Sequence, residues 1–398
     1  MNHNVSRRQL LKTSSAALLT SPAPRRMLAY VGTYSSPQGP EGSNGNGKGI
    51  YVFNMDPATG SLTEQQMCGD ERNPASLALH PSAKYLYAAN EVSNFDSHHA
   101  GAVTAYAIDA RSGRLTRLNI VSSEGAGPAH LSVHPSGKYV LVANYHGGSF
   151  AVLPILPNGR VTSATDVKQD TQAAGPIHAK SAPPGSFAIS GHDRSHAHMI
   201  ESDPSGNFVL GCDLGTDTIH VWRLNQQSGK LDLVSDVSVP AGDGPRHFVF
   251  HPDGRWLYSI QEESSTLILF DFDPKSGAAK ARQQISTLPA GFAGTNFTSE
   301  VRISMDGKFL YAANRLHDSI AVFAVGGSGE LAFASETWTR GDYPRSFTID
   351  PSGTYLYCCN QRSDAVTCFR INHATGGLTF TDRYTAVGTP SIIIFRIA

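Results

Sequence analysis

The chain has 398 residues and a formal net charge of −1 at pH 7, because 32 Lys and Arg residues face 33 Asp and Glu residues; this balance argues against a nucleic-acid-coating protein or a polybasic membrane binder. Hydrophobic residues make up 40% of the chain, which excludes wholesale disorder, and no run of 18 apolar residues predicts a membrane-spanning helix. The 38 glycines and 23 prolines favour the frequent turns of an all-β protein.

Residues 1–27 have the features of an export signal and are left out of the fold prediction. Ser6-Arg7-Arg8-Gln9-Leu10-Leu11-Lys12 matches the twin-arginine pattern, and a short apolar stretch at 16–19 follows it. That stretch is shorter than a usual signal core, and no clear cleavage motif follows. We therefore expect a periplasmic or otherwise exported protein, with a disordered tail on a cytoplasmic protein as the alternative.

From residue 28 onward one sequence motif recurs. In it, an apolar run leads into a turn of the type His-Pro-Ser-Gly-Lys, and an aromatic-rich run follows. The turn prolines or their equivalents are Pro81, Pro135, Pro204, Pro252, Met305 and Pro351. They recur on average about every 54 residues, a period typical of repeat architectures.

Each repeat predicts four short strands. In the copy at 244–285, strands are expected at 248–250, 256–260, 267–272 and 281–285, and the turn Pro252-Asp253-Gly254 joins the first two. Proline presets φ at its position and glycine permits a positive φ, so this tripeptide suits a tight turn. A four-stranded sheet repeated at this period is the blade of a β-propeller.

Six predicted blades contain this motif, and a seventh is split between the two ends of the repeat region. Residues 28–34, 49–54 and 61–67 predict three strands without an innermost one, and 390–395 predict a lone strand. Pairing them closes a ring of seven blades and removes exposed sheet edges. We predict a single propeller domain over 28–398, with a loop insertion near 168–198.

Aligning the repeats on the turn proline predicts which residues meet at one end of the central channel. Six places before it stand Ala75, Ala129, His198, Arg246, Ser299 and Arg345. Ten places after it stand Glu91, Tyr145, Leu214, Glu262, Arg315 and Gln361. A residue that the fold requires should recur in every blade. The candidates for function are therefore the residues near this rim that do not recur, which are His198, Arg246, Glu262, Glu300, Arg315 and His317.

Other conspicuous residues have architectural interpretations. The recurring Asn90, Asn144, Asn314 and Asn360 are expected to cap backbone groups, and His80, His134 and His251 to cap the turns at the opposite face. His192, His196 and His198 have a spacing seen in metal sites, but they border a loop, so a zinc site is not favoured. The five cysteines lack CxxC spacing and are expected to be free thiols.

The sequence resembles the lactonase family of seven-bladed propellers, which includes 6-phosphogluconolactonases and carboxymuconate lactonizing enzymes. The matching segments are Val31-Gly32-Thr33-Tyr34, Gly127-Pro128-Ala129-His130, Gly244-Pro245-Arg246-His247, Ser299-Glu300-Val301-Arg302 and Asn314-Arg315-Leu316-His317. The resemblance implies His198, Arg246, Glu262 and Arg315 as catalytic residues. We also expect His130, His247, Glu300, His317 and Arg345 to bind the substrate.

These residue types suit hydrolysis of a small anionic sugar lactone, in the manner of a 6-phosphogluconolactonase of carbohydrate metabolism. Arg246 and Arg315 offer planar donors for a phosphate, a carboxylate or an oxyanion, and Glu262 or His198 could activate water. No Gly-x-Ser-x-Gly elbow is present, and the scheme needs neither a metal nor a cofactor. A carboxymuconate cycloisomerase and a non-catalytic binding propeller are the alternatives. We expect a monomer with a small-molecule substrate and no nucleic-acid partner.

Overall fold

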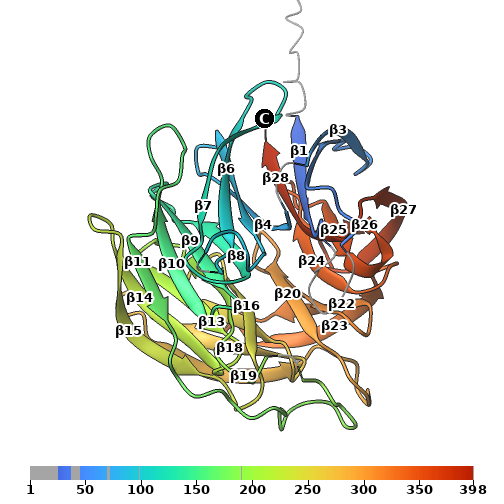
Figure 1. Ribbon diagram of the computed structural model, residues 1–398. Helices are drawn as coiled ribbons and strands as arrows, with labels where there is room; N and C mark the ends of the chain where they lie inside the picture. Colours follow the sequence, from blue (N-terminus) through green and yellow to red (C-terminus); the bar gives the residue numbers. More distant parts are fainter. Residues whose placement is uncertain (1–25, 37–44, 70–71, 98, 190, 398) are drawn as a thin grey trace, which may run out of the picture.

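Seven antiparallel four-stranded sheets surround a central axis in the computed structural model, which describes residues 26–36, 45–69, 72–97, 99–189 and 191–397 (Figure 1). The predicted seven-bladed propeller is therefore confirmed. All but the last two residues of the predicted export signal lie outside the described residues. Within the described ranges, no helix is long and apolar enough to cross a membrane.

The strands of each blade follow, from the channel outward. Blade 1 consists of β28 (Pro390–Ile397), β1 (Met27–Thr33), β2 (Ile50–Met55) and β3 (Leu62–Cys68). Blade 2 consists of β4 (Pro74–Leu79), β5 (Tyr85–Asn90), β6 (Ala102–Ile108) and β7 (Leu115–Ser122). Blade 3 consists of β8 (Pro128–Val133), β9 (Tyr139–Asn144), β10 (Ser149–Pro154) and β11 (Asp166–Gln169). Blade 4 consists of β12 (Ala197–Ser202), β13 (Phe208–Asp213), β14 (Thr218–Asn225) and β15 (Lys230–Ser238).

The remaining blades have the same order. Blade 5 consists of β16 (Pro245–Phe250), β17 (Trp256–Gln261), β18 (Thr266–Phe272) and β19 (Ala279–Ser286). Blade 6 consists of β20 (Thr298–Ile303), β21 (Phe309–Asn314), β22 (Ser319–Val325) and β23 (Leu331–Trp338). Blade 7 consists of β24 (Pro344–Ile349), β25 (Tyr355–Asn360), β26 (Ala365–Ile371) and β27 (Leu378–Ala386).

The ring closes as the sequence predicts. β28 pairs antiparallel with β1, with Met27 opposite Ile397 and Val31 opposite Ile393 (Figure 1). This pairing gives blade 1 its innermost strand from the far end of the repeat region. Closure leaves no blade without a neighbour on either side, which suppresses edge-to-edge association.

The apolar core lies between blades rather than within one central cluster. Each of the seven buried clusters combines residues of two adjacent blades, as where Leu210 of blade 4 packs with Phe248 of blade 5. Buried tyrosines add a hydrogen bond across several of these interfaces. Tyr87, for example, donates to the carbonyl oxygen of Gly159 in the next blade, at 3.1 Å. Packing between the blade faces therefore stabilises the ring independently of the site residues.

The predicted caps are confirmed at both ends of the strands. His80 Nδ1 contacts Ser82 Oγ at 2.8 Å within its own turn, and its Nε2 contacts the Gly137 carbonyl oxygen of the next blade at 3.0 Å. At the other end, the Asn90 side-chain amide donates to the carbonyl oxygen of Arg72 at 3.0 Å. These repeated side chains therefore hold loops in place.

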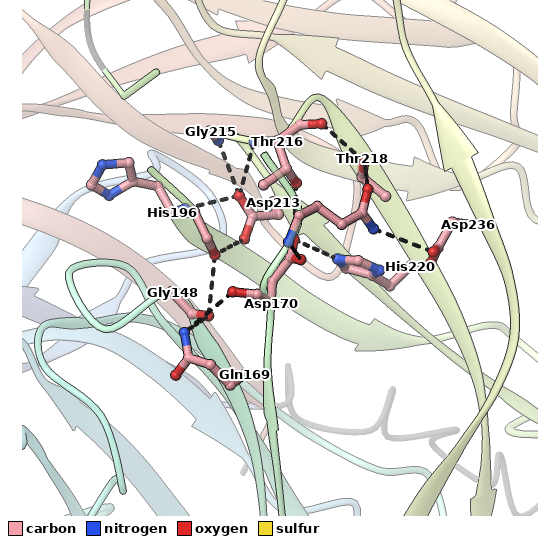
Figure 2. Close-up of polar contacts among 12 residues, drawn as sticks. Gly148, Gln169, Asp170, His196, Asp213, Gly215, Thr216, Thr218, His220 and Asp236 are labelled. Atoms are coloured by element: carbon pink, nitrogen blue, oxygen red, sulfur yellow. Dashed lines mark hydrogen bonds and ion pairs between the residues drawn. The ribbon is translucent and has the colours of Figure 1, made fainter. Parts of the chain in front are cut away.

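The insertion occupies residues 170–196, between β11 and β12, and is tied to blade 4 by buried polar contacts (Figure 2). Asp170 Oδ2 lies 3.0 Å from His220 Nε2, whose Nδ1 lies 2.7 Å from Asp236 Oδ1. Asp213 accepts the backbone N–H of His196 at 2.8 Å and the hydroxyl of Ser195. These contacts fix the chain immediately before His198.

A second anchor of the insertion is His192, which is 4% exposed. Its ring nitrogens lie 3.0 Å from Asp217 Oδ1 and 3.1 Å from Glu263 Oε1. Burial disfavours the charged imidazole, but the hydrogen bonds to these two carboxylates outweigh it and raise the pKa of His192 to about 9. All five cysteines are free thiols, as predicted, and burial raises the pKa of four of them.

Candidate active site

A β-bulge interrupts the innermost strand of every blade near its start. The pairing with the next strand skips one residue in six blades and two in blade 6. The skipped residues are Ser391, Ala75, Ala129, His198, Arg246, Ser299 with Glu300, and Arg345. A bulged residue is left out of the ladder and its side chain is re-aimed. The aligned column six places before the turn thus coincides with the bulge, and every bulged residue except Ser299 lines one of the two cavities along the axis.

Two cavities lie along the axis. The mouth cavity has an empty volume of about 410 Å³, which includes its open side. Its lining residues are Glu91, Ala129, Tyr145, His146, His198, Glu262, Arg315 and Arg345. The channel cavity shares Ala129, His198 and Arg345 with it, and its further polar lining includes His130, Arg246, His247, Glu300 and Arg302.

Three of the predicted catalytic residues form a buried ion cluster. Glu262 Oε2 lies 2.8 Å from Arg246 Nε and 2.6 Å from Arg315 Nη2. The three residues are at most 3% exposed and come from blades 5 and 6. One carboxylate oxygen therefore orients two guanidinium groups, which hold their remaining donors in a fixed arrangement.

The cluster carries more positive than negative charge around Arg246. Burial lowers the pKa of Arg246 to about 10, and the nearby guanidinium groups of Arg315 and Arg345 contribute to this shift more than Glu262 opposes it. Like charges that crowd in a buried site raise the free energy of the empty site. An anionic ligand would relieve this repulsion.

His198 joins the cluster as an uncharged base. Its side chain is 4% exposed, and within the described part of the chain its Nδ1 has no hydrogen-bond partner. Burial and the positive charge of Arg246 hold the pKa of His198 well below its usual value, so the imidazole is neutral at pH 7. An unpartnered nitrogen on a neutral imidazole is a group that can accept or relay a proton.

Arg345, from blade 7, also lines the mouth cavity. Its Nη2 lies 3.8 Å from Glu91 Oε2, and its guanidinium lies over the Tyr34 ring at 5.2 Å. The Tyr34 hydroxyl donates to the same Glu91 oxygen at 2.6 Å. Burial raises the pKa of Tyr34 well above its usual value, so the phenol keeps its proton. The mouth cavity is therefore lined by two guanidinium groups, those of Arg315 and Arg345.

The predicted substrate-binding residues fall into three places. Arg345 lines both cavities, whereas His130, His247 and Glu300 line the channel cavity below the mouth. His317 lines neither; its Nδ1 contacts Ser319 Oγ at 2.8 Å, and its ring packs against Phe292. We therefore leave His317 out of the binding proposal below.

The structure also adds Glu91, Tyr145 and His146 to the mouth cavity. Glu91 and Tyr145 stand ten places after the turn proline, in the same aligned column as Glu262 and Arg315. That column was a sequence signal, but it did not distinguish these residues from Leu214 and Gln361. Tyr145 stacks on the ring of His196 at 4.4 Å, so the insertion supports this side of the mouth.

The three histidines with metal-like spacing separate. His192 binds Asp217 and Glu263, His196 Nε2 lies 2.7 Å from Asp193 Oδ1, and His198 faces the mouth cavity. Among the described residues, no group of three or more His, Cys, Asp or Glu side chains is arranged to hold a metal ion.

Comparisons with known proteins agree with this architecture. The family described as lactonase, 7-bladed beta-propeller, matches residues 28–395. The 6-phosphogluconolactonase of Bacillus subtilis is 33% identical over 371 residues, which cover 93% of this chain and 98% of that protein. The 6-phosphogluconolactonase of Formosa agariphila is 32% identical and covers 83% of this chain and 91% of its own length. The solved structure of the periplasmic gluconolactonase of Pseudomonas aeruginosa superposes with a TM-score of 0.83 at 29% identity, covering 94% of this chain and all of that chain.

Proposed function

The chain belongs to the lactonase family of seven-bladed β-propellers, and from this premise we propose that it hydrolyses a small anionic sugar lactone at the mouth cavity, as a 6-phosphogluconolactonase does. The observation that carries the proposal is a cavity lined by Arg315, Arg345, Glu262 and a neutral His198, with Arg246 held against Glu262. The names of the B. subtilis, F. agariphila and P. aeruginosa relatives support the reaction class.

The charge of the substrate follows from the charge of the site. Burial, together with the charges of Arg315 and Arg345, lowers the pKa of Arg246. An anion in the cavity therefore gains from Arg315 and Arg345, which line it, and from the nearby charge of Arg246. Arg345 lines the cavity without belonging to the Arg246–Glu262–Arg315 ion cluster, and we assign it to the phosphate or other anionic group. The cluster then faces the ester carbonyl.

The reaction assigned to the cluster balances without an external reagent. The oxygen of water bonds to the lactone carbonyl carbon, and His198 accepts the proton that water loses. A guanidinium N–H of Arg246 or Arg315 donates to the developing oxyanion, an interaction worth roughly 3–4 kcal/mol in comparable sites. The bond between the carbonyl carbon and the ring oxygen then breaks, the ring oxygen takes up the proton, and the product acid ionises.

His198 is assigned as the base in preference to Glu262. The Oε2 atom of Glu262 lies within 2.8 Å of two guanidinium groups, which compete with any proton for that oxygen. His198 Nδ1 has no such competitor among the described residues. A bound anion adds negative charge near His198 and raises its pKa toward the range in which a general base works best. Glu262 then serves to hold the two arginines.

Proton release from a panel of lactones tests this function. The panel contains glucono-1,5-lactone, its 6-phosphate and other sugar lactones, each corrected for spontaneous hydrolysis and followed with a pH indicator. We expect the purified protein to accelerate hydrolysis of a phosphorylated or carboxylated lactone at least tenfold more than that of its neutral counterpart. No acceleration for any lactone would contradict the proposal.

The same panel separates the two alternative functions. A carboxymuconate is added, and its ultraviolet absorbance is followed. Loss of that absorbance without lactone hydrolysis would assign a cycloisomerase, which would use the same arginines to clamp carboxylates. Saturable ligand binding without turnover of any compound would assign a non-catalytic propeller.

We also propose that the protein is exported through the twin-arginine route. The motif that includes Arg7 and Arg8 supports this, and the P. aeruginosa relative is described as periplasmic. Fractionation of cells that express the full chain, with and without the double substitution Arg7→Lys and Arg8→Lys, tests the location. An unchanged cytoplasmic distribution of both forms would contradict export.

A further inference from the structure

His247 contacts Arg246 through a different guanidinium nitrogen from the one that faces Glu262. Arg246 Nη1 lies 3.4 Å from His247 Nε2 and also donates to the carbonyl oxygen of Ser299. On the other side of the imidazole, His247 Nδ1 lies 3.1 Å from Glu300 Oε1. The contacts thus run without interruption from Glu300 through His247 to Arg246 and on to Glu262.

The chemistry of these groups allows only one arrangement of protons on His247. A guanidinium group can donate but cannot accept, so Nε2 of His247 must carry a lone pair toward Arg246. The proton of the neutral imidazole then resides on Nδ1, where it is donated to Glu300. Both groups have the required charge: burial lowers the pKa of His247 to about 4, and Arg302 and His247 together lower the pKa of Glu300 to about 2 against the effect of burial.

From this arrangement we infer that His247 and Glu300 are positioning residues rather than substrate-binding residues. Glu300 selects the tautomer of His247, and His247 in turn fixes the guanidinium of Arg246. The inference rests on the proposed function, because Arg246 needs a fixed direction only if it acts on a bound lactone.

The surroundings of Glu300 and His247 support this role. Glu300 is 2% exposed, and its carboxylate also accepts the backbone N–H of Val301 at 3.1 Å and lies 3.4 Å from Arg302 Nη2. Glu300 and His247 line the channel cavity together with Arg246, and none of the three lines the mouth cavity. Of the three, Arg246 is the one in direct contact with Glu262, which does line the mouth cavity.

Arg246 needs this positioning because catalysis depends strongly on where the guanidinium lies. A displacement of a catalytic group by about 1 Å can cost on the order of 100-fold in rate. Without an acceptor at His247, Nη1 of Arg246 keeps only its contact with the Ser299 carbonyl, and the guanidinium can shift relative to Glu262. The expected loss therefore falls on kcat more than on KM, because the oxyanion forms only in the transition state.

Two amide substitutions at one position separate the positioning role from a packing role. In His247→Gln, the longer amide can present its oxygen to Arg246. In His247→Asn, the shorter amide can still donate to Glu300 but does not reach Arg246. We expect the Gln variant to keep kcat within about fivefold of the unsubstituted protein and the Asn variant to lose at least about tenfold, with KM changed less than about threefold in both. Equal kcat values in the two variants would overturn the inference.

A double-mutant cycle isolates the route through Arg246. In an Arg246→Ala background, His247→Asn should reduce kcat by less than about twofold further, because the group that it positions is already gone. Independent, multiplicative losses would mean that His247 acts on something else and would overturn the inference. Thermal unfolding is measured for each variant, and Glu300→Gln replaces any His247 variant that does not fold.

A spectroscopic measurement tests the tautomer without activity. In the folded full chain at pH 7, nitrogen-15 NMR of the His247 ring should show a protonated Nδ1 and an unprotonated Nε2. The opposite tautomer would overturn the inference. The proposed function fails separately, if the unsubstituted protein hydrolyses no lactone while His247 shows the expected tautomer.

Discussion

At one end of the innermost strands the side chains repeat from blade to blade, and at the other end they differ. At the turn end, His80 and His134 stand at the same position in consecutive blades and make the same two contacts, one with a serine of their own turn and one with a carbonyl of the next blade. At the mouth end, the bulge also recurs in every blade, but the bulged residues include Ala129, His198 and Arg246. The bulge is therefore a feature of the fold, while the side chain placed on it can differ between blades and carry chemistry.

The electrostatics of the two ends differ accordingly. Partial burial lowers the pKa of His134, whose hydrogen bonds go to neutral groups. At the mouth end, full burial and several guanidinium groups act together on His198 and Arg246. Residues with strongly shifted pKa values are common at functional sites, so this difference also favours the mouth end as the site of function.

The largest effect is expected at the ion cluster. Glu262→Gln removes the charge that separates the guanidinium groups of Arg246 and Arg315, and Arg246→Ala removes an oxyanion donor. We expect each to lower kcat/KM about 100- to 1000-fold in the proton-release assay. Because an unpaired buried charge costs roughly 3–5 kcal/mol, Glu262→Ala should also lower the free energy of unfolding by about that amount. Wild-type activity in both Glu262→Gln and Arg246→Ala would remove the cluster from the site.

His192 does not recur in the blades and yet has a structural role in the insertion. Lack of repetition alone therefore does not identify a functional residue. Its folded-state pKa of about 9 lies above the usual histidine value, so its contribution to stability is fully present below about pH 6.5 and is lost as pH rises through about 9. The contribution is on the order of 3 kcal/mol. We expect denaturant unfolding of His192→Asn to show a smaller loss of stability between these pH values than the unsubstituted protein shows.

Part of this pH dependence should survive in His192→Asn. The hydrogen bonds with Asp170 and Asp236 raise the pKa of His220 as well, against the effect of burial. An unfolding free energy that falls equally with pH in both proteins would mean that His192 carries no charge in the folded state.

A matched pair of histidine substitutions sharpens the comparison of the two ends. His198→Asn should lower kcat about 100-fold through loss of the base, with unfolding changed little. His134→Asn should leave kcat within about twofold and lower the unfolding free energy by about 1–2 kcal/mol, because it removes hydrogen bonds that join two blades. If His134→Asn impaired turnover as strongly as His198→Asn, the assignment of chemistry to one end would be wrong.

The smallest effects are expected in the turns of the far face. Gly254 and Gly137 both have φ near +70°, a conformation that costs a residue with a side chain about 1–2 kcal/mol. An added Cβ at Gly254 meets nothing within 4 Å, whereas at Gly137 it lies 2.7 Å from His80 Nε2. Gly254→Ala should therefore cost about 1 kcal/mol and Gly137→Ala more, both with unchanged kcat, as measured by chemical denaturation. Equal costs would mean that the contact between blades adds nothing.

The fold could be predicted because its determinants are local and repeated. Each turn carries its own proline and glycine signal, and the missing innermost strand of blade 1 has a visible counterpart at residues 390–395. The bulges have no such signal, because they arise from the pairing of two strands. For this reason the sequence placed the start of the first strand of blade 5 at residue 248, whereas β16 begins at Pro245.

The candidate site could be predicted only as a set of residues that converge on one rim. Alignment on the turn brought Arg246, Glu262 and Arg315 to one end, and the structure places them in direct contact. Alignment could not show that His247 faces Arg246 rather than the mouth, since that depends on the direction of side chains around the bulge. Nor could it exclude His317, which lies in a loop whose path the repeat does not determine.

The most direct test of the central claim is a crystal structure of the protein with a bound sugar acid, the product of the proposed hydrolysis. The account predicts electron density for the acid in the mouth cavity, with its carboxylate in hydrogen-bond contact with Arg246 or Arg315 and its phosphate near Arg345. His198 should lie beside the carboxylate carbon. An acid bound elsewhere on the propeller, with the mouth cavity occupied only by solvent at saturating concentration, would contradict the account.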